Sequence, residues 1–500
     1  MTRCSVCSLS VLVCLLGSAF APLLSFAAAR FIGAERYGVR PGHELLWRIP
    51  VSGAQQVEAV SLPSGVTFDR AHRTLRGRLA EPGDYPVVLR ASDGKQWVEQ
   101  RLTLCVGQTL CLAPPMGWNS WYSYAEAVSQ ADIEAVGQRL EASGLADAGY
   151  CYVNIDDCWQ GERPAGGGAL QPNEKFPDIR ALCQSLHARG LKAGIYTTPW
   201  ISSYAGFRGS SSEASEPHAI PPAERLQPGQ LYGRWPGLAQ RGVDHTGSQW
   251  HFARDARQFA DWGFDYVKVD WKPNDVPTTE RLASDLVACP RDIVLSLSNA
   301  APLQNAPGLA RLANLWRTTG DIQDTWASIR AIGRAQLRWL PFASEGHWND
   351  PDMLQIGNLG RPNRATRTFQ PSRLSPAEAR YQMTLWCMLS APLLISCDLE
   401  SLSPDTRALL TDPDLIELDQ KFAAAPLSLV YEGPHGFILC KRLTPTRTVF
   451  GFFNDSESTR EFSCLAPTGE PLTRRLAPHT AELLHCPSLH GANNAAAPTL

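Results

Sequence analysis

The strongest constraint on this fold is an alternation between residues 112 and 410, where short apolar runs are separated by longer stretches with apolar residues at helical spacing. Parallel strands need helical crossovers, so this alternation predicts a (β/α)8 barrel. An open doubly wound sheet is the alternative, but the first strand lacks a GxGxxG turn. The strand candidates are residues 116–118, 152–155, 192–196, 266–269, 293–297, 315–316, 353–356 and 394–396. The helix candidates are residues 131–142, 179–188, 253–262, 280–287, 328–340 and 376–389.

The start of the chain has the pattern of an export signal. Residues 1–3 supply one positive charge, residues 9–26 are apolar or small, and Ala19-Phe20-Ala21 or Ala27-Ala28-Ala29 offers a cleavage site. This predicts a secretory signal peptide over residues 1–29 and a secreted or periplasmic protein. An uncleaved membrane anchor is the alternative. No uncharged apolar run of about 18 residues follows residue 30, so no membrane contact is expected after cleavage.

Two β-rich regions flank the predicted barrel. Residues 30–110 hold short apolar runs between turn signals such as Pro63-Ser64-Gly65, which predict a small β-sandwich. Residues 411–490 lose the helical spacing and predict a second, antiparallel β domain, followed by a disordered tail over 491–500. The longest stretch without predicted structure, residues 201–249, follows the third strand and is expected to lie over the active face of the barrel.

Charge and cysteine content exclude some partners and cofactors. The chain has 46 Lys and Arg against 49 Asp and Glu, a net charge of −3, which argues against a nucleic-acid-binding protein. Signal cleavage would remove three of the 14 cysteines and leave an odd number, so at least one is unpaired. Cys151 and Cys158 lie on one predicted buried strand, which favours packed, free thiols. No His/Cys cluster has the spacing of zinc ligands, so no metal site is predicted.

Polar side chains gather where the predicted strands end, which is where barrels place their chemistry. Carboxylates recur at this rim with few basic residues. Such a rim suits a neutral, polyhydroxylated substrate, because carboxylates accept hydrogen bonds from hydroxyl groups, whereas a phosphorylated substrate would need more Arg and Lys. The strand ends carry Asp156 and Asp157, Tyr196, Asp270, Ser298, Arg317 and Asp321, and Asp352 lies just before the seventh candidate.

The fourth strand gives the most specific chemical hypothesis. Side chains alternate along a strand, so Lys268 and Asp270 share one face. A neighbouring Lys favours the ionised carboxylate that attacks an anomeric carbon, although a structural Lys–Asp pair would look the same. Asp321 is the candidate for the second carboxyl group, the acid/base, because retaining hydrolysis needs two of them about 5–5.5 Å apart. Asp324 competes for that role, and its alternative reading is a helix N-cap before Trp326.

Five motifs together resemble glycoside hydrolase family 27, the α-galactosidase and α-N-acetylgalactosaminidase family. In order they are Pro115-Met116-Gly117-Trp118-Asn119-Ser120-Trp121, Ile155-Asp156-Asp157-Cys158-Trp159, Leu191-Lys192-Ala193-Gly194-Ile195-Tyr196, Asp265-Tyr266-Val267-Lys268-Val269-Asp270 and Trp348-Asn349-Asp350-Pro351-Asp352-Met353. The resemblance implies a barrel, a C-terminal antiparallel domain, retaining chemistry and no cofactor. Residues 62–85 also resemble immunoglobulin-like modules attached to secreted bacterial enzymes.

The resemblance also implies roles for individual residues. Asp270 matches the nucleophile and Asp321 the acid/base. The matched substrate-binding residues are Asp156 and Asp157 at the 6-OH and 4-OH, Lys268 on the C3–C4 side, Arg317 near the 2-OH, Trp121 as an aromatic wall, Tyr196 beside the nucleophile, and Asp352 in a rim motif.

Two positions depart from the family pattern. Many relatives have a Cys two residues after the nucleophile, paired with a Cys in the loop after strand three; here the position is Lys272 and residues 201–249 contain no Cys. Many galactose-selective relatives carry a Glu near the end of strand five that reads the 2-OH. Alignment on Ser296 places Ser298 there, with Ala301 nearby.

We therefore expect a retaining α-galactosidase that acts on terminal α-galactosyl residues of oligosaccharides or glycans. The alternatives are an α-N-acetylgalactosaminidase or a β-L-arabinopyranosidase of the same family, or a non-catalytic, carbohydrate-binding barrel. The departure at Ser298 leaves the choice between galactose and N-acetylgalactosamine open.

Overall fold

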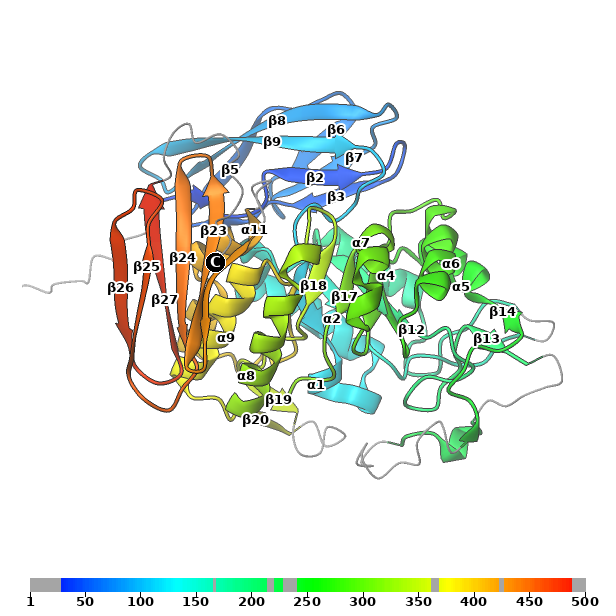
Figure 1. Ribbon diagram of the computed structural model, residues 1–500. Helices are drawn as coiled ribbons and strands as arrows, with labels where there is room; N and C mark the ends of the chain where they lie inside the picture. Colours follow the sequence, from blue (N-terminus) through cyan, green and yellow to red (C-terminus); the bar gives the residue numbers. More distant parts are fainter. Residues whose placement is uncertain are drawn as a thin grey trace, which may run out of the picture.

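The computed structural model describes residues 28–164, 168–213, 220–227, 241–360, 368–421 and 427–487. The predicted tail and all but the last two residues of the predicted signal peptide lie outside these ranges, as does part of the long stretch 201–249. In the described residues the chain forms a central barrel, with a β-sandwich on one side of it and an antiparallel sheet on another (Figure 1).

The central sheet confirms the predicted (β/α)8 barrel. Its order is β18-β17-β16-β15-β12-β11-β10-β21, and each neighbouring pair is parallel. A parallel bridge between Leu354 and Ile395 joins the segment after β18 to β21 and closes the barrel. The strands are β10 (Met116–Asn119), β11 (Tyr152–Asn154), β12 (Lys192–Thr197), β15 (Tyr266–Asp270), β16 (Val294–Ser298), β17 (Leu315–Arg317), β18 (Trp348–Asp350) and β21 (Leu393–Ile395).

The seventh strand was predicted in the wrong place. The apolar run 353–356 was expected to form it, but β18 lies over Trp348–Asp350, with Trp348 paired to Leu315 of β17. The run is buried for another reason: Leu354 donates its backbone N–H to Leu394 O at 2.8 Å and seals the barrel seam. The apolar run 353–356 therefore predicts buried residues correctly, but it does not predict the position of the strand.

Local sequence signals explain where the helices begin. Ser129 and Asp132 form a capping box at the start of α2, and Ser375 and Glu378 form another at the start of α9. Asp178 caps α4 through the backbone N–H of Ala181. The barrel-region helices are α1 (Trp121–Tyr124), α2 (Gln130–Ala142), α3 (Leu145–Ala148), α4 (Ile179–Ala188), α5 (Phe252–Trp262), α6 (Val276–Val287), α7 (Ala306–Leu312), α8 (Trp326–Ala335) and α9 (Pro376–Leu389). Short hairpin strands accompany them: β13 (Ser211–Ser212), β14 (Gln249–Trp250), β19 (Asn358–Gly360) and β20 (Phe369–Pro371).

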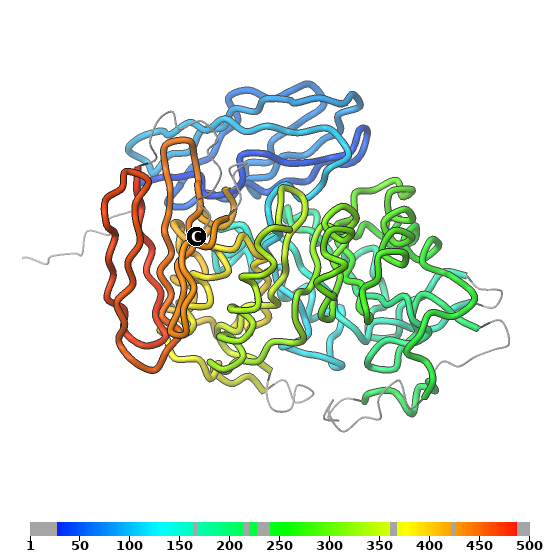
Figure 2. The backbone as a smooth tube through the Cα atoms, viewed as in Figure 1, coloured from blue at the N-terminus to red at the C-terminus, as the bar shows by residue number. Residues whose placement is uncertain are grey.

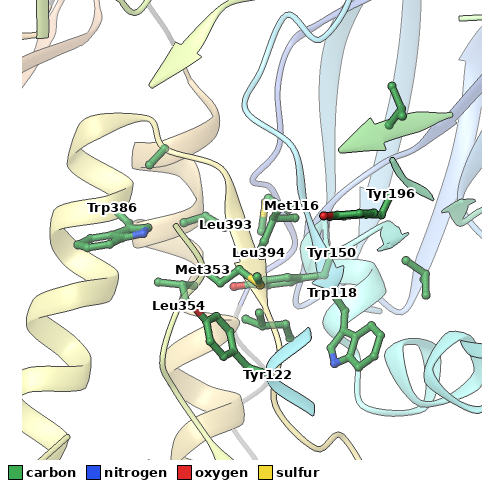
Figure 3. Packing of buried hydrophobic residues seen from close by; sticks show 14 of the residues in the cluster. Met116, Trp118, Tyr122, Tyr150, Tyr196, Met353, Leu354, Trp386, Leu393 and Leu394 are labelled. Atoms are coloured by element: carbon green, nitrogen blue, oxygen red, sulfur yellow. The ribbon is translucent and has the colours of Figure 1, made fainter. Parts of the chain in front are cut away.

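Helix α9 is buried on all sides from Tyr381 to its end. Every residue from Tyr381 to Leu389 is buried, because the helix lies between the barrel and the C-terminal sheet (Figure 1). Trp386 packs toward the barrel near Leu393 and Met353 (Figure 3), and its indole N–H donates to Asp352 O at 2.7 Å. A helix that is apolar around its whole circumference is stable only when both faces are covered.

The C-terminal region is an antiparallel β domain that begins later than its predicted boundary. Residues 411–490 were expected to lack helix, but α11 (Pro413–Gln420) follows α10 (Pro404–Leu410) and packs against α9. Asp412 caps α11 and Pro413 starts it, a signal the apolar spacing did not reveal. The sheet has the order β22-β23-β24-β27, beside the hairpin β25-β26. The strands are β22 (Ser428–Gly433), β23 (Gly436–Thr444), β24 (Arg447–Asn454), β25 (Arg460–Leu465), β26 (Pro471–Leu476) and β27 (Thr480–Pro487).

The N-terminal region consists of two packed sheets, β2-β9-β8-β5 and β3-β7-β6, with a common apolar core. The tube in Figure 2 shows this sandwich lying along one side of the barrel. The strands are β1 (Arg30–Phe31), β2 (Arg36–Val39), β3 (Leu45–Arg48), β4 (Val51–Ser52), β5 (Gln56–Ser61), β6 (Val66–Asp69), β7 (Thr74–Gly77), β8 (Gly83–Ser92) and β9 (Trp97–Val106). In the described part of the chain, no helix has both the length and the apolar character to span a bilayer.

Buried arginines join the sandwich to the barrel. Arg40 donates to both carboxylate oxygens of Asp292, which immediately precedes β16, and to the backbone oxygens of Val287 and Arg291. Arg48 donates to Arg189 O at 2.6 Å, just before β12. The sandwich therefore covers the end of the barrel where the strands begin and leaves the opposite end open.

Arg40→Ala should loosen this attachment. The change removes the arginine that pairs with the half-buried Asp292 carboxylate. We therefore expect the free energy of association between the sandwich and the barrel to weaken by about 3 kcal/mol. Hydrogen exchange should accelerate in β2 and β9 with little change in turnover, because the open end of the barrel is untouched. Arg101→Ala, an exposed position on β9, is the matched control. Equal exchange in both variants would show that Arg40 does not hold the sandwich.

Candidate active site

A polar pocket opens at the carboxyl ends of the barrel strands. The barrel fold places active sites at this end. The lining of the pocket comes from the carboxyl ends of β12, β15 and β17 and from the segments that follow β10, β11, β12, β16, β17 and β18. The lining residues are Trp121, Tyr122, Asp156, Asp157, Tyr196, Tyr204, Lys268, Asp270, Asn299, Arg317, Asp321 and Met353.

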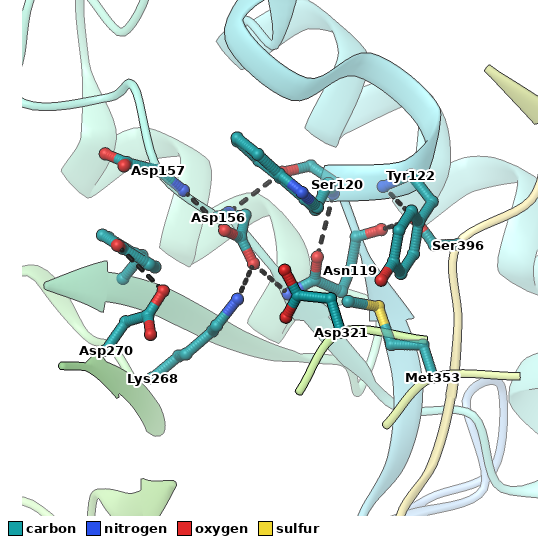
Figure 4. Close-up of polar contacts among 12 residues, drawn as sticks. Asn119, Ser120, Tyr122, Asp156, Asp157, Lys268, Asp270, Asp321, Met353 and Ser396 are labelled. Carbon is teal, nitrogen blue, oxygen red and sulfur yellow. Dashed lines mark hydrogen bonds and ion pairs between the residues drawn. The ribbon is translucent and has the colours of Figure 1, made fainter. Parts of the chain in front are cut away.

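Asp156 is the centre of a buried hydrogen-bond network on one side of the pocket (Figure 4). Its Oδ2 accepts from Asn119 Nδ2 and from Lys268 Nζ, both at 2.8 Å, and its backbone N–H donates to Ser120 Oγ at 2.9 Å. The charges of Asp156 and Asp270 raise the pKa of Lys268 despite the opposing effect of burial. Lys268 is therefore a fixed cation that reaches across from β15 to the segment after β11.

Asp157 is held by neighbouring backbone groups. Its Oδ1 accepts from the N–H of Cys158 at 2.8 Å and its Oδ2 from the N–H of Ala205 at 3.1 Å. Gln160 Nε2 donates to Oδ1 at 3.0 Å. Burial raises the pKa of Asp157 above its ordinary value, while these donors limit the rise. The contact with Ala205 fixes the loop after β12 over the pocket.

Asp270, the last residue of β15, is 7% exposed and held from both sides. Tyr196 donates its hydroxyl to Oδ2 at 3.1 Å, and the Asn299 amide donates to Oδ1. Burial raises the pKa of Asp270 to about 6; Lys268 opposes the rise, and the negative charges of Asp321 and Asp156 add to it. The two hydrogen bonds thus fix the orientation of the carboxylate, and its burial disfavours the ionised form.

Asp321 faces the same pocket but is more open, with 61% of its side chain exposed. Arg317 Nη2 donates to its Oδ1 at 3.1 Å. Desolvation favours the neutral acid, but the charges of Arg317 and Lys268 outweigh it and hold the pKa of Asp321 below its ordinary value. The negative charge of Asp321 raises the pKa of Asp270, so the two acids titrate as a pair that carries a single proton at mildly acidic pH.

Asp352 lies behind Arg317 and does not line the pocket. Its Oδ2 pairs with Arg317 Nη2 at 2.8 Å and accepts from the backbone N–H of Ile322 at 2.9 Å. It adopts a left-handed backbone conformation, with φ of 82°, and is buried. Asp352 therefore positions both the guanidinium and the loop that carries Asp321, rather than facing a ligand itself.

The structure brings eight of the ten predicted site residues into one pocket: Trp121, Asp156, Asp157, Tyr196, Lys268, Asp270, Arg317 and Asp321. Asp352 lies behind this group, and Ser298 is a buried residue at the end of β16 that does not line the pocket. The following residue, Asn299, lines it instead. Sequence reasoning missed Asn299, Tyr122, Tyr204 and Met353; the only available signal for Asn299 was a polar residue directly after a strand.

Asp324 does not line the pocket, and it is not the helix cap either. Thr325 caps α8 by accepting from the backbone N–H of Ser328, so the predicted cap is one residue early. Asp324 is 1% exposed and pairs with Arg373, whose Nη2 lies 2.6 Å from its Oδ1.

All eleven described cysteines are unpaired, including Cys158, which is buried. The position two residues after Asp270 is Lys272. Among the residues that the structure describes, no group of three or more His, Cys, Asp and Glu side chains could hold a metal ion.

A closed (β/α)8 barrel with paired carboxylates in a polar pocket at its open end defines the class of the protein as a glycoside hydrolase. The family model for α-galactosidase A matches residues 113–219 and 238–421. The chain belongs to this family, glycoside hydrolase family 27.

Relatives agree with this assignment. An α-galactosidase of Oryza sativa is 33% identical over 337 residues, covering 66% of this chain and 69% of that one. An α-N-acetylgalactosaminidase of Gallus gallus is 30% identical over 396 residues, covering 73% and 84%. A Bacteroides fragilis structure, described as a candidate α-galactosidase/melibiase, has a TM-score of 0.78 at 26% identity and covers 92% of this chain and 98% of its own. That coverage extends the likeness beyond the barrel into the N-terminal sandwich.

Asp270→Asn should stabilise the fold in a pH-dependent way. The pKa of Asp270 is about 6 in the folded protein and about 3.9 in an unfolded chain, so the fold favours the neutral acid. The free energy of unfolding of the wild type should fall relative to that of the variant as the pH rises from about 4 to about 6, and the difference should then stay constant at about 3 kcal/mol. Denaturant unfolding of both proteins across this pH interval measures the difference.

The control for this prediction is Asp261→Asn, an exposed position on α5. It serves as the reference for the removal of one surface carboxylate. A pH-independent difference for Asp270→Asn would contradict the shifted titration.

Proposed function

We propose that this protein is a retaining α-galactosidase that releases terminal α-galactosyl residues from oligosaccharides or glycans. One observation carries the mechanism: Asp270 and Asp321, from β15 and from the loop after β17, line the same pocket as the Asp156–Lys268 pair. Retaining hydrolysis needs one carboxylate to attack and a second carboxyl group to move a proton. The family relatives that carry the name α-galactosidase support the substrate class.

In the proposed first step, an oxygen of ionised Asp270 attacks the anomeric carbon while protonated Asp321 gives its proton to the leaving oxygen. The glycosidic bond breaks and a galactosyl ester of Asp270 forms. In the second step, Asp321 removes a proton from water, which attacks the same carbon and frees Asp270. Two inversions retain the α configuration. The shifted pKa values place the single proton of the pair on Asp270 below about pH 6 and leave Asp321 ionised. The first step therefore requires the proton to move to Asp321 when the sugar binds.

The sugar lies across the pocket in this proposal. Asp156 and Asp157 accept hydrogen bonds from the 4-OH and 6-OH, and Lys268 donates on the C3–C4 side. Because Asp156 already accepts from Asn119 and Lys268, its orientation is fixed before the sugar binds. Trp121 and Tyr196 supply flat apolar surfaces at the pocket wall.

Asp321→Asn should slow the hydrolysis of a substrate more strongly when its leaving group must be protonated to depart. We expect kcat/KM to fall about 10³-fold for an α-galactoside with a sugar leaving group, which must be protonated, and by less than about tenfold for a dinitrophenyl α-galactoside. Steady-state kinetics on the two substrates measure the difference. Asp324→Asn, the neighbouring acid that lies outside the pocket, should leave the ratio between the two substrates unchanged.

Two outcomes would count against the proposal. Equal losses on both substrates would remove Asp321 from the acid/base role. Wild-type protein that releases no galactose from any α-galactoside, or that first releases the β anomer as seen by NMR, would overturn the function itself.

We further propose that the protein is exported and that residues 1–29 are removed. The charged start, the apolar run and the small-residue sites support this. N-terminal sequencing of the protein recovered from outside the cytoplasm should begin at Arg30, just after Ala29. A mature protein that still begins at Met1 would contradict cleavage.

A further inference from the structure

A cavity of about 90 Å³, the interdomain cavity, lies between the N-terminal sandwich and the end of the barrel where the strands begin. Its lining includes Tyr37 and Trp47 of the sandwich, Cys111 of the connecting segment, and Tyr152 and Lys192 at the starts of β11 and β12. Figure 2 shows the sandwich on this side of the barrel. A volume of this size holds a few water molecules or one small ligand.

Lys192 places a buried cation in the interdomain cavity. It is 9% exposed, and its Nζ donates to the hydroxyls of Tyr37 at 2.5 Å and of Tyr152 at 3.4 Å. Burial opposes the charge, but its two phenol partners and the nearby Asp265 carboxylate outweigh burial and hold the pKa of Lys192 above its ordinary value. In the described part of the chain, no carboxylate oxygen lies within 4 Å of this nitrogen.

The other charged side chains that line the cavity are already in ion pairs. These pairs are Arg36 with Glu345, Arg48 with Asp147, Arg291 with both Asp265 and Glu44, and Asp292 with Arg40. Asp265 also pairs with His187 at 2.8 Å and accepts from the backbone N–H of Ala193 at 2.9 Å, so its charge is balanced without Lys192. Among the lining cations that the structure describes, Lys192 alone has no acid in contact with it.

The lining also has more hydrogen-bond donors than its own acceptors satisfy. Lys192 has three N–H groups for two hydroxyl partners, and the Tyr152 hydroxyl meets no acceptor among the described residues. The Nε groups of Arg48 and Arg291 are buried and have no hydrogen-bond partner in the same residues, whereas no buried side-chain oxygen of the described lining lacks one. Buried donors in surplus are satisfied by an acceptor, and a buried cation by a negative one.

The remainder of the lining is apolar and decides between kinds of anion. It consists largely of residues such as Pro50, Leu110, Leu112, Pro115 and Val294. An inorganic dianion such as phosphate would lose much of its hydration against these walls and gain a single free cation in return. A monocarboxylate with a short aliphatic chain instead places one charge at Lys192 and buries its chain against the apolar wall.

We propose that the interdomain cavity binds a small aliphatic monocarboxylate, whose oxygens accept hydrogen bonds from Lys192 and Tyr152. Because Tyr37 belongs to the sandwich and Lys192 to the barrel, the bound anion strengthens the attachment between them. The site lies at the opposite end of the barrel from the polar pocket and does not depend on the reaction proposed there.

Propionate is the probe, and its neutral isostere propionamide is the matched ligand control. Thermal unfolding of the wild type is followed at about pH 7 and constant ionic strength, with propionate replacing chloride. A ligand that binds only the folded state stabilises it by RT ln(1 + [L]/Kd), so a Kd of about 5 mM predicts that about 100 mM propionate raises Tm by about 2 °C. Propionamide at the same concentration should raise Tm by less than about 0.5 °C.

Two substitutions in the cavity test the named groups. Lys192→Met should abolish the difference between propionate and propionamide. Tyr152→Phe keeps both the cation and the ring but removes a hydroxyl donor, so it should weaken the Kd about fivefold, and it tests the site even if Lys192→Met fails to fold. Lys95→Met is the matched control, since it changes an exposed lysine between β8 and β9, and it should respond as the wild type does. Saturation-transfer NMR of propionate measures the Kd directly.

Three results would overturn the proposal. In the first, propionate and propionamide shift the wild-type Tm equally. In the second, Tyr152→Phe binds propionate as tightly as the wild type does. In the third, phosphate at the same ionic strength gives the larger shift, which would assign the cavity to inorganic anions. Turnover of an α-galactoside tests the proposed function separately, and none of these results bears on it.

Discussion

The site depends on two buried cations placed among carboxylates. Lys268 pairs with Asp156, and Arg317 pairs with Asp321 and Asp352. Without them, several acids in one small pocket would largely stay protonated, because burial and mutual repulsion both favour the neutral form. With them, Asp321 ionises readily while Asp270 retains a proton to about pH 6. The division of charge between the two catalytic candidates is therefore set by which carboxylate each cation touches.

The barrel supplies the geometry that this charge pattern requires. Parallel strands bring side chains from distant parts of the chain to one rim, so Lys268 of β15 can reach Asp156 after β11. The N-terminal sandwich covers the opposite end, where Arg40 and Arg48 bind backbone and acids just before the strands begin. Because the sandwich is attached only at the end where the strands begin, that end of the barrel is held rigid and the pocket at the other end stays open.

Much of this could be predicted from the sequence. Alternating runs gave seven of the eight strands near their observed places, and polar residues directly after strands gave most of the pocket, because parallel strands share one active end. The failures have local causes. The run 353–356 is apolar because it seals the barrel seam, and α11 was missed because its start is marked by a cap and a proline rather than by spacing.

The two misplaced site residues have a different cause. Alignment on Ser296 predicts Ser298 and motif position predicts Asp352, but the backbone takes left-handed conformations at Asn299 and at Asp352. Such turns redirect a side chain and are only weakly encoded by non-glycine residues. Position along a strand could be predicted; the direction in which the chain leaves that strand could not.

The burial of α9 from Tyr381 to Leu389 sets a limit on how this enzyme can be divided. One side of the helix closes the barrel and the other underlies the C-terminal sheet, so neither part has a finished surface without the other. A shortened chain ending before β22 would expose a broad apolar strip, which promotes self-association.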